Sequence, residues 1–245
     1  FAVDHRTPLV QRWGGWYVTE KVGSVPHAGN VPVVVKASEF TGKRGPTPRL
    51  STVAGTFDTT GYLSPHSDVA ALMVLDHQVR MTNLITRLGW EARVAAEAPG
   101  SAPAARPAAA AGGAARVAEA VRDLVDYLLF VDEAPLSGRL EGTSSFAAEF
   151  AALGPRDGKG RSLREFELER RMMRHPCSYM IYTPAFDALP PAALDAVYRR
   201  LWQILSGEER GRTYAHLTLA GREAIVEILR ETKPTLPGYF QRVQR

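Results

Sequence analysis

The first thirty residues of the chain concentrate side chains that can bind a cofactor. They hold two of the six histidines, His5 and His27, and two of the four tryptophans, Trp13 and Trp16, with glycines between them. Glycine lets a backbone approach a bound group closely, and a histidine on such a loop is a frequent metal ligand. This composition predicts that the segment forms one wall of a binding site.

His27 and the two tryptophans of this segment each allow two interpretations. His27, which is followed by Ala28-Gly29-Asn30, is a candidate ligand for a metal ion or a haem. The alternative is a histidine that is hydrogen-bonded within a turn. Trp13 and Trp16 are candidate walls of an aromatic pocket, or else they pack as a small core on a neighbouring helix.

Three basic side chains of the same segment are candidates for holding an anion. His5 and Arg6 are adjacent, and together they would clamp a carboxylate such as a haem propionate. Arg12 is a further candidate, because a planar guanidinium can donate two parallel hydrogen bonds to a carboxylate. For each of the three, the alternative is an ordinary structural hydrogen bond.

A long amphipathic segment supplies a second candidate ligand. Apolar residues recur with helical period over about residues 68–98, which predicts a helix of some thirty residues. His77 lies on this helix, and Met73 and Met81 share its face because they are four residues away on either side. His77 is either an axial ligand to a haem or another metal, or a core histidine bonded to a backbone carbonyl of the N-terminal segment.

The whole pattern predicts a mainly α protein with a helical bundle-like domain built on a long helical hairpin. Residues 1–65 form an irregular N-terminal segment, and residues 66–245 form the helical domain. The stretch 99–115, rich in alanine, proline and glycine, is predicted to be a flexible linker that leads into the second helix of the hairpin. Further elements are expected as short strands at Trp16–Thr19 and Val31–Val35 and as helices at Arg116–Val131, Ser144–Leu153, Ser162–His175, Ala192–Leu205 and Leu219–Thr232.

Composition excludes several classes of protein. The net charge is only +4 and the arginines are scattered beside acids, which is typical of a solvated surface and not of a nucleic-acid groove. An acidic partner remains an open alternative. Charged residues interrupt the apolar runs, so no transmembrane segment is expected. The single cysteine, Cys177, allows no internal disulfide, and we expect it to be a buried structural thiol.

Sequence signatures of catalysis are absent. The chain has no Gly-x-Ser-x-Gly, P-loop, His-Glu-x-x-His or Gly-x-Gly-x-x-Gly motif. One pair of adjacent carboxylates, Asp132-Glu133, is interpreted as a solvated helix end. A cofactor-free enzyme is therefore the least favoured of the functions considered.

Longer motifs carry a resemblance over nearly the whole chain, apart from the alanine-rich stretch. They include Asp4-His5-Arg6-Thr7-Pro8, Arg12-Trp13-Gly14-Gly15-Trp16-Tyr17-Val18, His27-x-Gly29-Asn30, Asp76-His77-Gln78 and Ser178-Tyr179-Met180-Ile181-Tyr182. Together they resemble a little-characterised family of bacterial extracytoplasmic cytochrome c-like proteins. The resemblance implies a periplasmic or extracellular location and a haem c attached at a Cys-x-x-Cys-His site upstream of the Asp-His-Arg segment.

This chain lacks the cysteines of that site, so the attachment would lie upstream of residue 1, or the haem has been lost. If a haem is present, the resemblance implies a redox role, with His27 or His77 as the distal ligand. The leading prediction is thus an extracytoplasmic cytochrome-like protein, or its haem-free C-terminal bulk, in electron transfer or redox sensing with a redox protein as partner. The alternative is a structural or accessory subunit of a larger membrane-associated complex, without a catalytic role.

Overall fold

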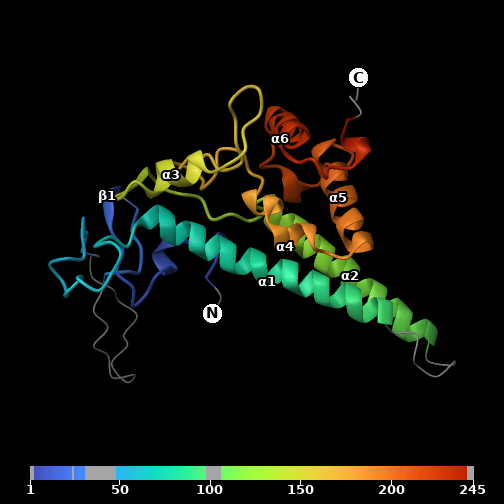
Figure 1. Ribbon diagram of the computed structural model, residues 1–245, viewed down its shortest axis with the longest axis horizontal. Helices are drawn as coiled ribbons and strands as arrows, with labels where there is room; N and C mark the ends of the chain where they lie inside the picture. The colour runs from blue at the N-terminus through green and yellow to red at the C-terminus, as the bar shows by residue number, and fades with distance from the viewer. Residues whose placement is uncertain (1–2, 24, 31–47, 98–105, 242–245) are drawn as a thin grey trace. The chain divides into compact units, whose positions relative to one another are not determined.

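A computed structural model describes residues 3–23, 25–30, 48–97 and 106–241 of the chain (Figure 1). The chain divides into two compact units, and neither is a continuous stretch of sequence. Unit 1 consists of Phe1–His77, Glu133–Leu153 and Phe166–Arg174, and unit 2 of Gln78–Asp132, Gly154–Glu165 and His175–Arg245. The predicted division instead has a single boundary between residues 65 and 66.

The protein is mainly α, as predicted. In the described residues the helices are α1 (Val69–Glu97), α2 (Arg106–Leu128), α3 (Phe146–Ala152), α4 (Pro184–Asp187), α5 (Pro191–Leu205) and α6 (Leu219–Thr232). The same described residues contain two strands, β1 (Glu20–Gly23) and β2 (Leu140–Gly142). Short 3-10 helices occur at Leu9–Gln11, Tyr179–Tyr182, Arg212–Tyr214 and Gly238–Gln241. The apolar periodicity therefore located the long helix α1 to within about one residue at each end.

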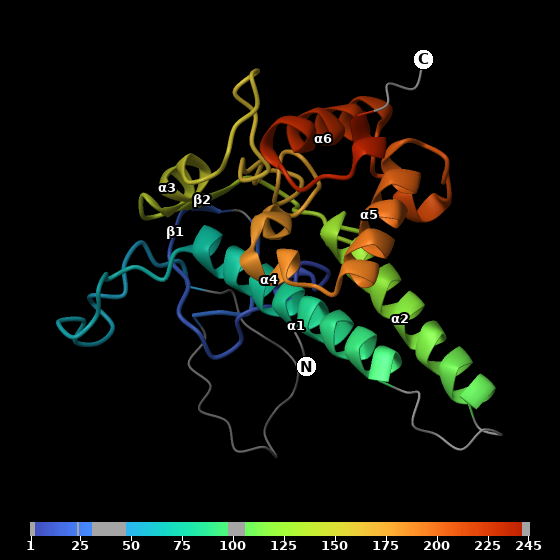
Figure 2. The same ribbon diagram turned by 45° about the vertical axis from the view of Figure 1, so that its right-hand side comes forward.

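The predicted helical hairpin is present in unit 2. Beyond His77, α1 packs on α2, and Figures 1 and 2 show the two helices side by side from two directions. Arg87 on α1 reaches two carboxylates on α2, Asp123 at 2.7 Å and Glu119 at 2.8 Å. These exposed ion pairs add little stability individually, so the hairpin depends mainly on its apolar faces.

The prediction of a flexible linker over residues 99–115 is wrong for its second half. Residues 98–105 lie outside the described part of the chain, but α2 already begins at Arg106. Pro107 is tolerated because the first turn of a helix needs no backbone N–H donor. Gly113 favours close packing, since a Cβ there would lie 3.3 Å from the side chain of Ala95 on α1. The high helix propensity of alanine then outweighs the remaining helix breakers.

Helices α5 and α6 agree with the predicted boundaries to within one residue. The side chain of Thr218 caps α6 by accepting a hydrogen bond from the Gly221 N–H at 3.1 Å. Helix α5 packs against α2 and also contacts α6 (Figure 2). Apolar side chains of both helices are buried, among them Val197, Leu201, Ile204, Ile225, Ile228 and Leu229.

The short strands of unit 1 differ from the prediction. β1 begins at Glu20 and not at Trp16, and it pairs antiparallel with β2, with Val22 opposite Glu141. Residues 16–18 form no strand: the Trp16 N–H donates to the Trp13 carbonyl in a turn in which Gly15 has a φ of 83°. Thr19 makes isolated β-bridges to Leu50 and Asp68. The second predicted strand, Val31–Val35, lies outside the described residues.

The helix predicted at Ser162–His175 is absent, and a carboxylate explains why. Glu167 Oε2 accepts backbone hydrogen bonds from Glu169, Arg170 and Arg171, which closes a tight loop in place of a helical turn. Leu168 has a φ of 54°, a left-handed conformation that interrupts a helix. At the start of the predicted helix, the Ser162 hydroxyl accepts the Arg164 N–H in a local turn.

A capping aspartate fixes the start of α1 in unit 1. Asp68 Oδ1 accepts the Ala70 N–H at 2.9 Å, and Oδ2 accepts both the N–H and the hydroxyl of Ser144. Gly142 makes this approach possible, because a Cβ there would lie within 2.3 Å of the carboxylate oxygens. One side chain therefore ties the first turn of α1 to the end of β2.

Candidate functional site

Two histidines that are 72 residues apart in the sequence meet inside unit 1. His5 Nδ1 and His77 Nδ1 are 2.8 Å apart, so one ring donates a hydrogen bond to the other. The rings stack with their centroids 5.1 Å apart, and both are almost fully buried. Burial lowers the pKa of His77 to about 3, so this ring is neutral at physiological pH.

A buried arginine lies next to this pair. Arg12 is 1% exposed, and its guanidinium donates to the carbonyls of His5 at 2.9 Å and Thr7 at 2.6 Å. Arg12 Nη1 is also 3.8 Å from Asp76 Oδ2. The guanidinium thus fixes the turn that carries His5 and brings a positive charge beside a carboxylate of α1.

Asp76 is the polar group of this cluster that lies closest to solvent. Its Oδ2 accepts a hydrogen bond from Trp13 Nε1 at 3.0 Å, and its side chain is 14% exposed. Burial raises the pKa of Asp76 to about 6, although Arg12 and the Trp13 hydrogen bond act in the opposite direction. Trp13 itself is buried and has a φ of 64°, an unusual backbone conformation for a tryptophan.

Glu133 belongs to the same unit and is not the solvated group that the sequence indicated. Its Oε1 accepts the Met172 N–H at 2.7 Å, and burial raises its pKa to about 7. The next residue, Ala134, donates its N–H to the His5 carbonyl at 3.0 Å. Arg12 opposes the rise in the Glu133 pKa, so one guanidinium influences two buried carboxylates.

His27 is buried within a turn. Its Nδ1 accepts the Gly29 N–H at 3.0 Å, its Nε2 is 3.9 Å from Glu20 Oε1, and its ring meets Trp13 edge-on. Burial lowers the pKa of His27 and raises that of Glu20. Gly29 is required here, because a Cβ would lie 2.6 Å from Val18 Cγ2. This geometry corresponds to the alternative of a histidine hydrogen-bonded in a turn.

A groove of about 350 Å³ opens above Asp76. Trp13 and Trp16 line it from the N-terminal segment, and Leu72, Leu75 and Asp76 line it from α1. Trp16 is 58% exposed and Leu75 is 45% exposed, so both belong to the open rim. The groove is therefore a mostly apolar depression with one carboxylate.

The structure brings together five of the residues around the predicted wall: His5, Arg12, Trp13, Asp76 and His77. The clamp of His5 with Arg6 is not formed, because His5 is turned toward His77 while Arg6 is only half-buried. Asp76 was not predicted as a site residue, because the sequence shows it only as a neighbour of His77. Its one signal was its place beside a histidine on an otherwise apolar stretch of helix.

The residues present do not fit a haem held by His27 or His77. An axial ligand must direct a ring nitrogen at open space large enough for the macrocycle. Here His77 is fully buried with its Nδ1 against His5, and His27 Nδ1 is engaged by Gly29. Neither histidine lines the groove above Asp76. Within the described ranges, no cluster of three or more histidine, cysteine, aspartate or glutamate residues could hold a metal ion.

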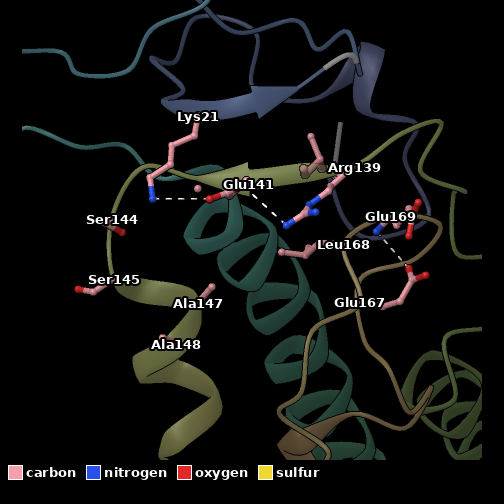
Figure 3. Close-up of a pocket in the computed structure, with 12 residues that line it drawn as sticks. Lys21, Arg139, Glu141, Ser144, Ser145, Ala147, Ala148, Glu167, Leu168 and Glu169 are labelled. Atoms are coloured by element: carbon pink, nitrogen blue, oxygen red, sulfur yellow. Dashed lines mark hydrogen bonds and ion pairs between the residues drawn. The ribbon is translucent and has the colours of Figure 1, made fainter.

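A second cavity of unit 1, of about 410 Å³, lies beside β2 and α3. Figure 3 shows Lys21 and Arg139 on either side of the Glu141 carboxylate, at 3.6 and 3.9 Å. On its far side the Glu167 carboxylate accepts the Glu169 N–H. Lys21 and Arg139 are exposed to solvent and already pair with the Glu141 carboxylate. We therefore expect a charged ligand to bind more weakly in this cavity than in the groove above Asp76.

Comparison with known proteins gives no relative: no family model, curated protein or solved structure matches the chain. The resemblance to cytochrome c-like proteins therefore stays a hypothesis that rests on the sequence motifs.

In the part of the chain that the structure describes, every helix is too short or too polar to cross a membrane. Cys177 is buried, and burial raises the pKa of its thiol to about 12.

Proposed function

We propose that the protein is an extracytoplasmic, cytochrome-like component of an electron-transfer or redox-sensing system, in which it acts as a partner-binding subunit. The observation that carries the proposal is the convergence of three separate motifs of the resemblance. Asp4–Pro8 contributes His5, Arg12–Val18 contributes Arg12 and Trp13, and Asp76–Gln78 contributes the groups that they contact.

The physical cost of this convergence supports a functional role. Removing Arg12 and a carboxylate from water costs several kcal/mol per ion, and an apolar core of the same volume is frequently as stable or more stable. Buried titratable groups with shifted pKa values gather at functional sites more than elsewhere. Among the described residues of unit 1, burial raises the pKa of three carboxyl groups, those of Glu20, Asp76 and Glu133.

An exposed aromatic surface favours the binding of a partner. Tyr17, Phe57 and Tyr62 form a chain of rings with centroids 5.4 and 5.6 Å apart, and Tyr62 is 66% exposed. The next residue, Leu63, is fully exposed. Contiguous aromatic and aliphatic side chains on a surface are typical of protein interfaces. This surface is also the observation that favours the second candidate, an accessory subunit of a membrane-associated complex.

The test is purification of the full gene product from its native extracytoplasmic fraction, followed by a reduced-minus-oxidised spectrum. The proposal expects a haem α-band, either in the protein or in a chain that co-purifies with it at fixed stoichiometry. Tyr62→Ser should reduce co-purification, whereas Leu153→Ser, an exposed leucine that follows α3, should not. A co-purifying complex without haem would support the accessory subunit instead, and neither haem nor partner would refute both.

A further inference from the structure

The groove above Asp76 presents a carboxylate oxygen to solvent and shields its positive partner. Among the described residues, both contacts of the Asp76 side chain, with Trp13 and with Arg12, are made by Oδ2. Oδ1 thus remains for a ligand in the groove. Arg12 is 1% exposed and does not line the groove, so a ligand meets the negative charge and not the positive one.

The charges around Asp76 are unbalanced in favour of acid. Arg12 lowers the pKa of both Asp76 and Glu133, and Asp4 raises that of Asp76. Burial raises the pKa of Asp76 to about 6 and that of Glu133 to about 7, and Arg12 offsets only part of each rise. A second positive charge near Asp76 would stabilise its ionised form.

The walls of the groove suit a cation that carries apolar groups. The electron-rich face of a tryptophan attracts an ammonium group, and the attraction is strongest where water is displaced. Trp13 is buried at the base of the groove and Trp16 is exposed at its rim, while Leu72 and Leu75 supply aliphatic contact. The volume of about 350 Å³ lies in the range of small-molecule sites.

We propose that this groove binds a small organic cation, an alkyl- or arylammonium whose nitrogen contacts Asp76 Oδ1 and whose apolar part packs on Trp16 and Leu75. The inference goes beyond the proposed function and does not depend on a haem or on a protein partner. An anionic ligand is disfavoured, because Asp76 has the only charged side chain among the described residues that line the groove. A neutral ligand of the same shape lacks both the ion pair and the cation–π attraction.

The experiment titrates the full chain with benzylammonium at pH 8, where Asp76 is ionised, and compares benzyl alcohol as the neutral control of nearly equal shape. Binding is followed by calorimetry and by the tryptophan fluorescence. We expect benzylammonium to bind at least about tenfold more tightly than benzyl alcohol, which corresponds to one ion pair with cation–π support. Equal affinities, or no binding of benzylammonium, would overturn the proposal.

Matched variants locate the site. Asp76→Asn keeps an acceptor for Trp13 and should weaken benzylammonium binding about tenfold without changing the binding of benzyl alcohol. Leu75→Lys, at an exposed position, places a positive charge at the rim and should abolish binding even if Asp76→Asn fails to fold. Leu219→Lys, an exposed control in unit 2, should bind like the wild type.

The aromatic wall has its own control. Trp16→Leu should weaken binding about 3- to 30-fold, which is the size of a cation–π contribution. Trp90→Leu removes a similarly exposed tryptophan from α1 in unit 2 and should have no effect. Unchanged binding in both Leu75→Lys and Trp16→Leu would show that the cation binds elsewhere and would refute the site.

Discussion

Among the described residues, each unit holds one buried arginine, Arg12 in unit 1 and Arg222 in unit 2, and the two differ in what surrounds the charge. In the described part of unit 2, all the hydrogen bonds of the Arg222 guanidinium go to backbone carbonyls, those of Ile204, Glu209, Tyr214 and Leu217. In unit 1, Arg12 donates to two carbonyls and also faces the carboxylate of Asp76. Carbonyl dipoles solvate a cation at any pH, whereas carboxylates gain and lose protons. Arg222 therefore acts as a structural clamp, and Arg12 couples the fold of unit 1 to the ionisation of its neighbours.

The largest expected effect separates the two arginines. Arg12→Met and Arg222→Met should each lower the free energy of unfolding by about 3–5 kcal/mol, because each removes a buried, hydrogen-bonded charge. The loss for Arg12→Met should be greater at pH 8 than at pH 5, since ionised Asp76 and Glu133 then lack their cation. Urea unfolding at both pH values measures this difference. Equal losses for Arg12→Met at the two pH values would contradict the comparison.

The helix caps of the two units provide a second contrast. Asp68→Ala in unit 1 should cost about 3 kcal/mol, because it removes the cap of α1 and leaves the Ser144 groups unsatisfied. Thr218→Ala in unit 2 should cost about 1 kcal/mol, since it removes one capping hydrogen bond. Thermal or urea unfolding measures both, and similar costs would show that Asp68 does no more than cap a helix.

The third prediction concerns acid and His77. Its pKa is lowered from 6.5 to about 3, so below pH 6.5 the unfolded chain takes up a proton that the folded chain does not. The wild type should therefore lose about 2–3 kcal/mol relative to His77→Gln as the pH falls from 6 to 4. Unfolding curves of the two proteins at each pH test this, and parallel pH dependence would exclude a neutral buried ring.

The smallest effect concerns Glu133 and has the opposite sign. Its pKa is raised from 4.5 to about 7, so between these values the folded chain holds a proton that the unfolded chain releases. Stability from this group is present at low pH and is lost as the pH rises through 7. The wild type should lose roughly 1–2 kcal/mol relative to Glu133→Gln between pH 5 and pH 7. A constant difference between the two proteins would count against burial of the carboxyl group.

Helices α1, α5 and α6 were predictable from sequence because their signals are local. The apolar period located α1, and the cap at Thr218 with the following apolar positions located α6. The helix predicted at Ser162–His175 is absent because the Glu167 carboxylate accepts hydrogen bonds from three backbone N–H groups of its own loop. The spacing of apolar residues along the sequence carries no information about these hydrogen bonds.

The candidate site was predictable only in part, because its geometry depends on distant residues. His5, Arg12, Trp13 and His77 stood out as residue types, and the structure brings all four to one place. The burial of Glu133 was not visible, since it results from contact with Met172, which is 39 residues away. The orientation of the His27 ring likewise depends on a distant contact: its Nδ1 accepts the Gly29 N–H, and Gly29 packs closely against the side chain of Val18.

The contact between His5 and His77 has a consequence for the isomers that this protein adopts. When both rings are neutral, the contact between their Nδ1 atoms holds one shared hydrogen, so the donor ring has no hydrogen on Nε2 and the acceptor ring carries one there. The pair therefore exists in two tautomeric arrangements of identical composition and charge. Moving between them requires both hydrogens of the pair to be repositioned together, the shared one between the Nδ1 atoms and the other from one Nε2 to the other, at a place that water does not reach.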